Sequence, residues 1–266
     1  MLPGIFEGLL SKLKIPYIVD FDDPTFHSYD LHKSALIRIL LKNKIKKVIN
    51  NSAVVVAGND YLAEYARTSG ASNIVIIPTV VDLNDYVLQK HMNSTNQFTI
   101  GWIGSPHGYK YINNIHPVLE RFFLNNSGRL IVVGSGNCTI PNIPLINKVW
   151  QEEKEYEYIS EFDVGIMPLE DSPWERGKCG FKLIQYMACA LPVIASPVGI
   201  NNNLIQNKRN GFLCYTHEQW YNALTYLKDN KTEGKQMGME GRKLVENYYS
   251  LQANLPKLLE IFQHFG

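Results

Sequence analysis

The stretch Glu175-Arg-Gly-Lys-Cys-Gly-Phe-Lys-Leu-Ile-Gln-Tyr-Met-Ala-Cys-Ala-Leu-Pro-Val-Ile-Ala195 decides the fold. An apolar strand ends before it at Met167, a glycine-containing loop follows, a helix begins near Phe181, and another strand starts after Pro192. This order of strand, loop, helix and strand is typical of a parallel α/β sheet. In such a sheet the loop lies at the carboxyl ends of the strands, where ligands bind.

The loop and the helix start after it suit an anion. Backbone amides and the positive end of the helix dipole near Gly180 and Phe181 favour a phosphate, and Arg176, Lys178 and Lys182 add positive charge. From these residues alone, an ordinary glycine turn with solvated lysines is an equally good interpretation.

A second loop has the same character. Gly104-Ser-Pro-His-Gly-Tyr-Lys110 follows the apolar run 98–103 and opens a helix, with Lys110 in its first turn. Two such loops in one sheet predict a diphosphate that is held from two sides. Without the partner loop, Lys110 would count as an ordinary exposed lysine.

Composition indicates a folded protein. The chain has 266 residues, 45% of them hydrophobic and 19% charged, which are globular values that exclude a disordered chain. The formal charge of +1 gives no electrostatic argument for nucleic acid as a partner.

The cysteines and the termini indicate the compartment. Cys138, Cys179, Cys189 and Cys214 form no closely spaced pair, so we expect reduced thiols and no zinc or redox motif. The sequence has neither a signal peptide nor an apolar run that could span a membrane, so we expect a cytoplasmic protein.

The chain divides into two sets of elements around a polar linker expected at 89–97. The first set has strands expected at 17–19, 53–57 and 74–77, with helices at 31–49 and 61–69. The second set has strands expected at 98–103, 130–133, 164–167 and 193–195, with helices at 109–124, 151–161, 181–190 and 219–228. An open nucleotide-binding sheet has five or six strands, so the first set looks incomplete.

On these residues the chain resembles a retaining GT-B glycosyltransferase of family 4. Gly104, followed six residues later by Lys110, matches the glycine and the diphosphate-contacting lysine of that family. Residues 185–195 match its Glu-Ala-Met-Ala-x-Gly-Leu-Pro-Val-Ile signature, and residues 210–213 match its Asn-Gly strand. Residues 77–82 resemble its Pro-Asn-Gly-Val-Asp segment.

The resemblance covers residues 16–245 and implies an α/β fold of GT-B type. Its two Rossmann-like domains would have parallel sheets, the N-terminal one incomplete. The expected domains are a partial acceptor-side domain with the linker at 1–92, a nucleotide-sugar-binding domain at 93–248, and a C-terminal helix at 249–266 that returns to the first domain.

The resemblance also implies an activity. A sugar would move from a nucleotide-diphosphate sugar to a saccharide or lipid-linked saccharide with retention, in surface polysaccharide or glycoconjugate synthesis. No metal or cofactor is expected, because helix amides, Lys110 and Lys182 would stabilise the departing diphosphate. The expected donor-binding residues are Gly104, Ser105, Lys110, Trp150, Lys178, Gly180, Phe181, Lys182 and Gln185.

The chain departs from the family at its two glutamates, which are replaced by Gly177 and Gln185. The family's second glutamate binds the donor ribose, and the amide of Gln185, on a compatible helix face, can also bond a hydroxyl. The first glutamate touches the donor sugar. Gly177 cannot do so, and Glu175, Arg176 or Lys178 is the expected substitute.

The first set of elements offers a carboxylate. Asp22 takes the place of the family's histidine, where it would orient or deprotonate the acceptor hydroxyl. Asp20 and Asp22 also resemble the start of a Mg²⁺-dependent phosphatase with an aspartate nucleophile, although Pro24 departs from that pattern. Capping of the following helix by these acidic residues is an equally good interpretation.

A basic amphipathic helix is expected within 32–47. Leu36, Ile39 and Leu40 recur at helical spacing, and lysines crowd its end. Such a helix can contact the inner face of an anionic membrane. The favoured expectation, however, is that the apolar side of the helix packs on the sheet.

Two further expectations concern the whole chain. An incomplete first sheet exposes an unpaired edge, which favours self-association. A non-catalytic or truncated nucleotide-binding protein stays open as an alternative to the transferase.

Overall fold

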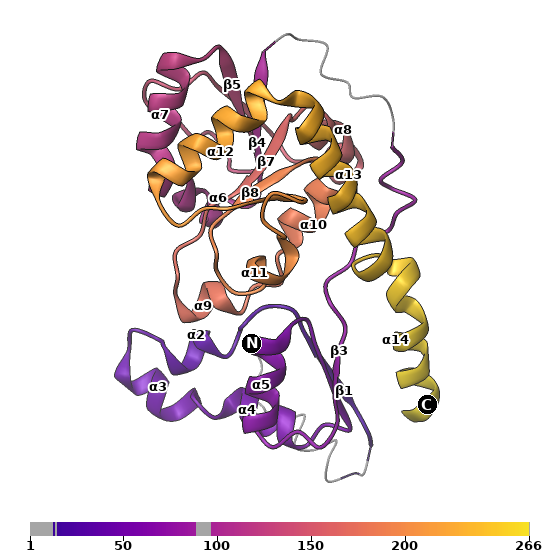
Figure 1. Cartoon of the computed structure of the whole chain (residues 1–266). Coiled ribbons are helices and arrows are strands. Elements are labelled where there is room, and N and C mark those ends of the chain that lie inside the picture. Colours follow the sequence, from indigo (N-terminus) through magenta and orange to yellow (C-terminus); the bar gives the residue numbers. More distant parts are fainter. Residues whose placement is uncertain (1–12, 14, 89–96, 266) are drawn as a thin grey trace. The chain divides into compact units, whose positions relative to one another are not determined.

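A computed structural model describes residues 13, 15–88 and 97–265 of the chain (Figure 1). The chain forms two compact units. The first contains residues up to 79 together with 171–179 and 254–266, and the second contains 80–170 and 180–253. The linker expected at 89–97 falls, except for its last residue, outside the described residues.

The first unit has a parallel sheet of three strands, in the order β1 (Ile18–Phe21), β2 (Val54–Ala57) and β3 (Ile74–Ile76). All four residues of β2 are buried, because helices cover both faces of the sheet. On one face, Val55 packs against Ile49 and Ala66. On the other face, Val54 and Val56 pack against Ile261.

Among the described residues, the helices of this unit are α2 (His27–Asp30), α3 (Ala35–Leu41), α4 (Lys44–Asn50), α5 (Asp60–Thr68), α9 (Pro173–Arg176) and, from residue 254 onward, α14 (Leu251–Phe265). The single helix predicted at 31–49 is therefore wrong. Its C-terminal half, α4, buries Ile49 against the sheet.

The packing expected for α3 is also wrong. Leu36, Ile39 and Leu40 are 65%, 71% and 69% exposed, and α3 has no buried residue. The physical reason is length. A four-residue strand covers about 13 Å, whereas a 19-residue helix would measure about 28 Å. The sheet therefore covers α4 and α5 and leaves α3 in solvent.

The second unit has a parallel sheet of six strands in the order β6-β5-β4-β7-β8-β9. The strands are β4 (Phe98–Ile103), β5 (Gly128–Val133), β6 (Leu145–Lys148), β7 (Val164–Met167), β8 (Val193–Ala195) and β9 (Gly211–Leu213). The four strands predicted from apolar runs are present. The sequence pattern missed β6, a short edge strand with half-buried and exposed residues.

Helices of very different length pack around the larger sheet. They are α6 (Pro106–Tyr109), the 3-10 helix η1 (Lys110–Ile115), α7 (His116–Asn125), the 3-10 helix η2 (Glu152–Lys154), α8 (Glu155–Ser160), α10 (Phe181–Ala188), α11 (Asn201–Leu204), α12 (His217–Asp229) and α13 (Lys231–Tyr248). The helices predicted at 109–124 and 151–161 are thus each divided into shorter pieces. Figure 1 shows α12 beside α7 and α13 beside α10.

Glycines on α13 allow it to approach α10 closely. A Cβ at Gly238 would collide with the backbone of Ala190, and one at Gly241 would lie 2.9 Å from Cγ of Met187. Glycine disfavours helix in general, which explains why the sequence pattern missed this 18-residue helix.

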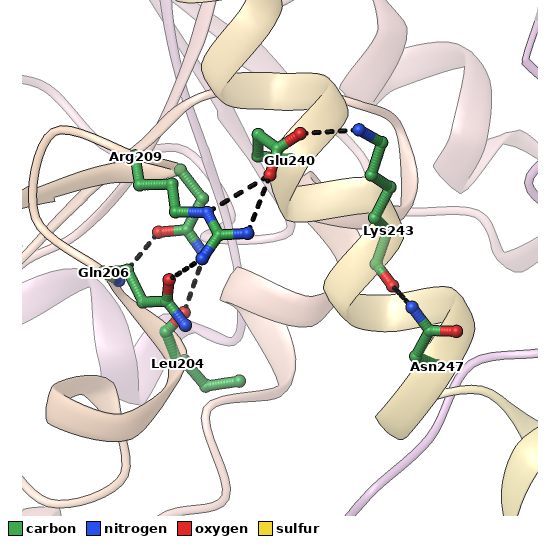
Figure 2. A network of polar contacts seen from close by, with 7 residues as sticks. Leu204, Gln206, Arg209, Glu240, Lys243 and Asn247 are labelled. Atoms are coloured by element: carbon green, nitrogen blue, oxygen red, sulfur yellow. Dashed lines mark hydrogen bonds and ion pairs between the residues drawn. The ribbon is translucent and has the colours of Figure 1, made fainter.

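The Asn-Gly signature before β9 has a structural role. The side-chain amide of Asn210 donates to the Leu204 carbonyl at 2.9 Å, and its oxygen accepts from the Gln206 amide at 2.8 Å. Figure 2 shows how Arg209 then reaches Glu240 on α13. These bonds fix the turn to the helix behind it.

Candidate donor-binding site

Within the second unit, the loop after β4 and the start of α10 meet at Gly104. A Cβ at this position would lie 2.6 Å from Cε of Lys182 and 2.9 Å from two ring carbons of Trp102. Glycine therefore leaves the space in which the Lys182 side chain lies. The Lys182 ammonium group is 5.5 Å from the centre of the Trp102 ring. The structure thus brings Gly104 and Lys182 together at the carboxyl end of β4.

Another glycine, Gly134, which the sequence analysis missed, lies against the loop after β4. Gly134 follows β5 with a φ of +83°, a conformation that favours glycine. A Cβ there would lie 2.8 Å from the Gly104 carbonyl oxygen and 3.2 Å from Cβ of Trp150. Trp150, after β6, therefore lies beside the same loop. The available signal was the Gly-Ser-Gly sequence at 134–136 directly after a strand.

Helix α10 begins at this place. Its N-cap residue is Gly180, with a φ of +71° and the Leu204 side chain where a Cβ would be. Glycine has no side chain that could cap the helix, and the N-terminal end of a helix carries the positive end of its dipole, which favours an anion. Phe181 and Lys182 are the first two residues of this helix.

Ser105 and Lys110 lie on the neighbouring loop. Ser105 is the exposed N-cap residue of α6, and Lys110 stands where α6 passes into η1. The Lys110 ammonium group lies over the Tyr111 ring, 4.8 Å from its centre. Lys110 therefore lies in the loop where it was expected. Its ammonium group packs on Tyr111, whereas that of Lys182 packs on Trp102.

Gln185 is only 3% exposed, and its amide donates to the Glu155 carboxylate. The same carboxylate accepts the Tyr86 hydroxyl at 2.6 Å and the Trp150 indole N–H at 2.9 Å. Burial, and then the bond to Glu155, raise the pKa of Tyr86. Sequence reasoning missed Glu155 and Tyr86, because nothing in the pattern joins three distant segments.

The loop that precedes α10 belongs to the first unit. A Cβ at Gly177 would lie 2.5 Å from Cβ of Pro24, so a glutamate does not fit at this position. The Asn59 amide donates to the carbonyls of Gly177 and Lys178, at 2.9 and 3.1 Å. The family's first glutamate is therefore replaced for a packing reason.

Three residues were expected to substitute for the family's first glutamate, and two of them are held by bonds within the loop itself, which includes α9 (Pro173–Arg176). Glu175 is buried and accepts a hydrogen bond from the Ser172 hydroxyl. Arg176 pairs with Asp171, with 2.6 Å between its Nε and the carboxylate. Lys178 is half-buried and stays a candidate.

Asp22 is exposed in the first unit, beside Gly58. Burial and the charge of Asp22 raise the pKa of Asp20. Helix α2 begins after Phe26, whose side chain makes no cap bond. Across 15–88 and 97–265, no three His, Cys, Asp or Glu side chains form a group that could hold a metal.

The two α/β units, with parallel sheets of three and six strands, are those of GT-B glycosyltransferases. A family model described as "Glycosyl transferases group 1" matches residues 97–230, and the chain belongs to this family. Members of this family transfer a sugar from a nucleotide sugar. No curated protein matches the sequence significantly.

Solved structures agree in fold. HepE from Anabaena, in complex with UDP, matches with a TM-score of 0.79 at 13% identity, over 98% of this chain and 76% of that one. Sucrose-phosphate synthase from Thermosynechococcus elongatus matches with a TM-score of 0.77 at 15% identity, over 98% and 72%. The pneumococcal O-GlcNAc transferase GtfA, in complex with UDP and GlcNAc, matches with a TM-score of 0.66 at 14% identity, over 98% of this chain and 59% of that one.

Proposed function

We propose that the chain transfers a sugar from a nucleotide-diphosphate sugar to an acceptor hydroxyl, with retention at the anomeric carbon. The observation that carries this proposal is the contact of Lys182 with Gly104 at the start of α10. It gathers an ammonium group, a helix N-terminus and a glycine loop around one place, which is the chemistry that binds phosphate.

Each residue has a role in this proposal. Lys182 and the first amides of α10 hold the diphosphate and stabilise the charge that develops as it departs. Lys110 adds a second ammonium group once a ligand draws it from Tyr111. Ser105, Trp150, Phe181 and the other expected donor contacts shape the site. Asp22 is the carboxylate proposed to orient or deprotonate the acceptor hydroxyl.

The related structures give the first donor to test. HepE is described in complex with UDP and with UDP-glucose. We therefore propose a uridine diphosphate sugar as the donor, and a saccharide or lipid-linked saccharide of surface polysaccharide or glycoconjugate synthesis as the acceptor.

The experiment is an assay of UDP release from UDP-glucose and UDP-N-acetylglucosamine, with and without added saccharides, in the presence of EDTA. We expect acceptor-dependent release that needs no divalent metal. Binding of the donors without any release, under the same conditions, would support the non-catalytic alternative instead.

A second proposal concerns where the chain works. On α3, Leu36, Ile39 and Leu40 are exposed, and Lys42, Lys44, Lys46 and Lys47 follow directly in the sequence. Exposed apolar side chains next to cations suit the surface of an anionic membrane. We propose that α3 contacts such a surface. Over the described ranges, no helix is long and apolar enough to cross a membrane.

A further inference from the structure

Glu155 joins three separate parts of the second unit. Its carboxylate accepts hydrogen bonds from Tyr86 in the segment before β4, from Trp150 after β6, and from Gln185 on α10. Tyr86 and Gln185 are buried, with 6% and 3% of their surface exposed. Their positions therefore fix the carboxylate in one orientation.

The fixed carboxylate borders a cavity of about 670 Å³ within the same unit. Trp150, Phe181 and Tyr86 also line this cavity, whereas Gln185 is not among its lining residues. Glu155 thus borders the cavity, whereas Gln185 lies behind it and only donates a hydrogen bond to its carboxylate. The oxygen that a ligand would meet belongs to Glu155.

The charges of the cavity select the part of a ligand that enters it. Among the described lining residues, every charged side chain is a carboxylate, namely Asp82, Asp85, Glu152, Glu153 and Glu155. Carboxylates repel phosphate but accept hydrogen bonds from hydroxyl groups. The exposed rings of Phe181 and Trp150 offer flat apolar surfaces for a base.

The cavity also adjoins the proposed phosphate site. Phe181 lines the cavity, and the next residue, Lys182, lies on Gly104. A ligand with a neutral, hydroxyl-bearing aromatic end and an anionic end fits this arrangement, which describes a nucleoside diphosphate.

We infer that Glu155 accepts a hydrogen bond from a ribose hydroxyl of the donor, and that Gln185 is the positioning residue that orients its carboxylate. This inference rests on the proposed function. Three protein donors occupy three of the roughly four acceptor positions of a carboxylate, which leaves one for the ligand. The contact with the donor ribose that was expected of Gln185 is thus assigned to Glu155 on α8.

The experiment compares ribose with deoxyribose by calorimetry. UDP, GDP and ADP are titrated first, and the best binder is then compared with its 2′-deoxy and 3′-deoxy forms. We expect the wild type to bind the ribonucleotide about tenfold or more tightly than one deoxy form, because a bond to a charged acceptor is lost. Glu155→Gln should abolish this preference.

The controls separate folding from recognition. Glu157→Gln, on the same helix but exposed and outside the cavity lining, should keep the preference. Binding of inorganic pyrophosphate should be unchanged in Glu155→Gln, which shows that the variant is folded and keeps its phosphate site.

The positioning role of Gln185 has its own readout. Gln185→Glu places two carboxylates together, and one of them takes up a proton at a raised pKa. We expect nucleotide binding by this variant to weaken at pH 8 and to recover toward pH 5.5, unlike the wild type. A pH profile identical to that of the wild type would refute the positioning role.

Besides the pH profile, two outcomes would overturn the inference, and they differ. If Glu155→Gln binds nucleotide with the full ribose preference, the role of Glu155 is wrong while the proposed function stands. If no nucleoside diphosphate binds to the wild type, the proposed function fails and the inference fails with it.

Discussion

At position 177 the side chain is absent because Pro24 occupies its space. Overpacking a filled site costs about 1–3 kcal/mol. Restoring the family residue by Gly177→Glu should therefore lower the thermal unfolding midpoint rather than improve activity. The matched control is Gly234→Ala on α13, where the nearest atom to a Cβ is 3.5 Å away. This control should be neutral or stabilising. Equal stability of Gly177→Glu and the wild type would refute the packing explanation.

The four cysteines are buried and none forms a disulfide. Burial raises the pKa of the Cys179 and Cys214 thiols to about 12. Because the thiolate is the reactive form, almost none of it exists at pH 8. We expect Ellman's reagent to label these thiols slowly in the native protein and rapidly in denaturant. Fast labelling of both thiols in the native protein would contradict their burial.

At the scale of elements, the site depends on how closely the loop after β4 approaches α10. Gly104→Ala places a methyl group 2.6 Å from Cε of Lys182 and must displace that side chain. We expect nucleoside diphosphate binding to weaken about tenfold, by calorimetry, and the unfolding midpoint to fall as well, because the same methyl group would lie 2.9 Å from two ring carbons of the buried Trp102. Gly108→Ala on α6 is the control, because its Cβ would meet Trp102 at an ordinary 3.4 Å. Equal affinities of the two variants would argue against the Gly104 contact.

The exposed face of α3 makes a second prediction at this scale. Leu36→Ser combined with Leu40→Ser removes apolar surface that is already in solvent, so the unfolding midpoint should hardly change. Co-sedimentation with vesicles that contain phosphatidylserine should fall several-fold, while binding to phosphatidylcholine vesicles should be weak for both proteins. Undiminished co-sedimentation of the variant would show that α3 does not contact the membrane.

The sequence pattern predicted those elements that bury an unbroken apolar run. The strands β4, β5, β7 and β8 are of this kind, and each was expected close to its observed place. The pattern failed where tertiary packing decides. Helix α13 depends on glycines that contact α10, and the division between α3 and α4 depends on the length of a sheet that lies elsewhere in the sequence.

At the scale of the whole molecule, some residues of the candidate site could be predicted from the sequence and others could not. Gly104, Gly180 and Lys182 carry local signals, since each lies where a strand ends or a helix begins. Glu155 carries no local signal, because its three partners come from residues 86, 150 and 185. Its place in the site follows only from the order β6-β5-β4-β7-β8, which sets these segments side by side.

The central claim is that Lys182 and the start of α10 hold a diphosphate without a metal. The most direct measurement is calorimetric titration of UDP and UMP in EDTA with the wild type, Lys182→Ala, Lys110→Ala and the exposed control Lys235→Ala on α13. The loss of one charge-assisted bond, worth about 1.5–3 kcal/mol, should weaken UDP binding by tenfold or more in the first two variants. The control should bind as the wild type does, and the wild type should prefer UDP to UMP. Equal UDP affinity in Lys182→Ala and Lys235→Ala, or a preference for UDP that appears only with Mg²⁺, would contradict the claim.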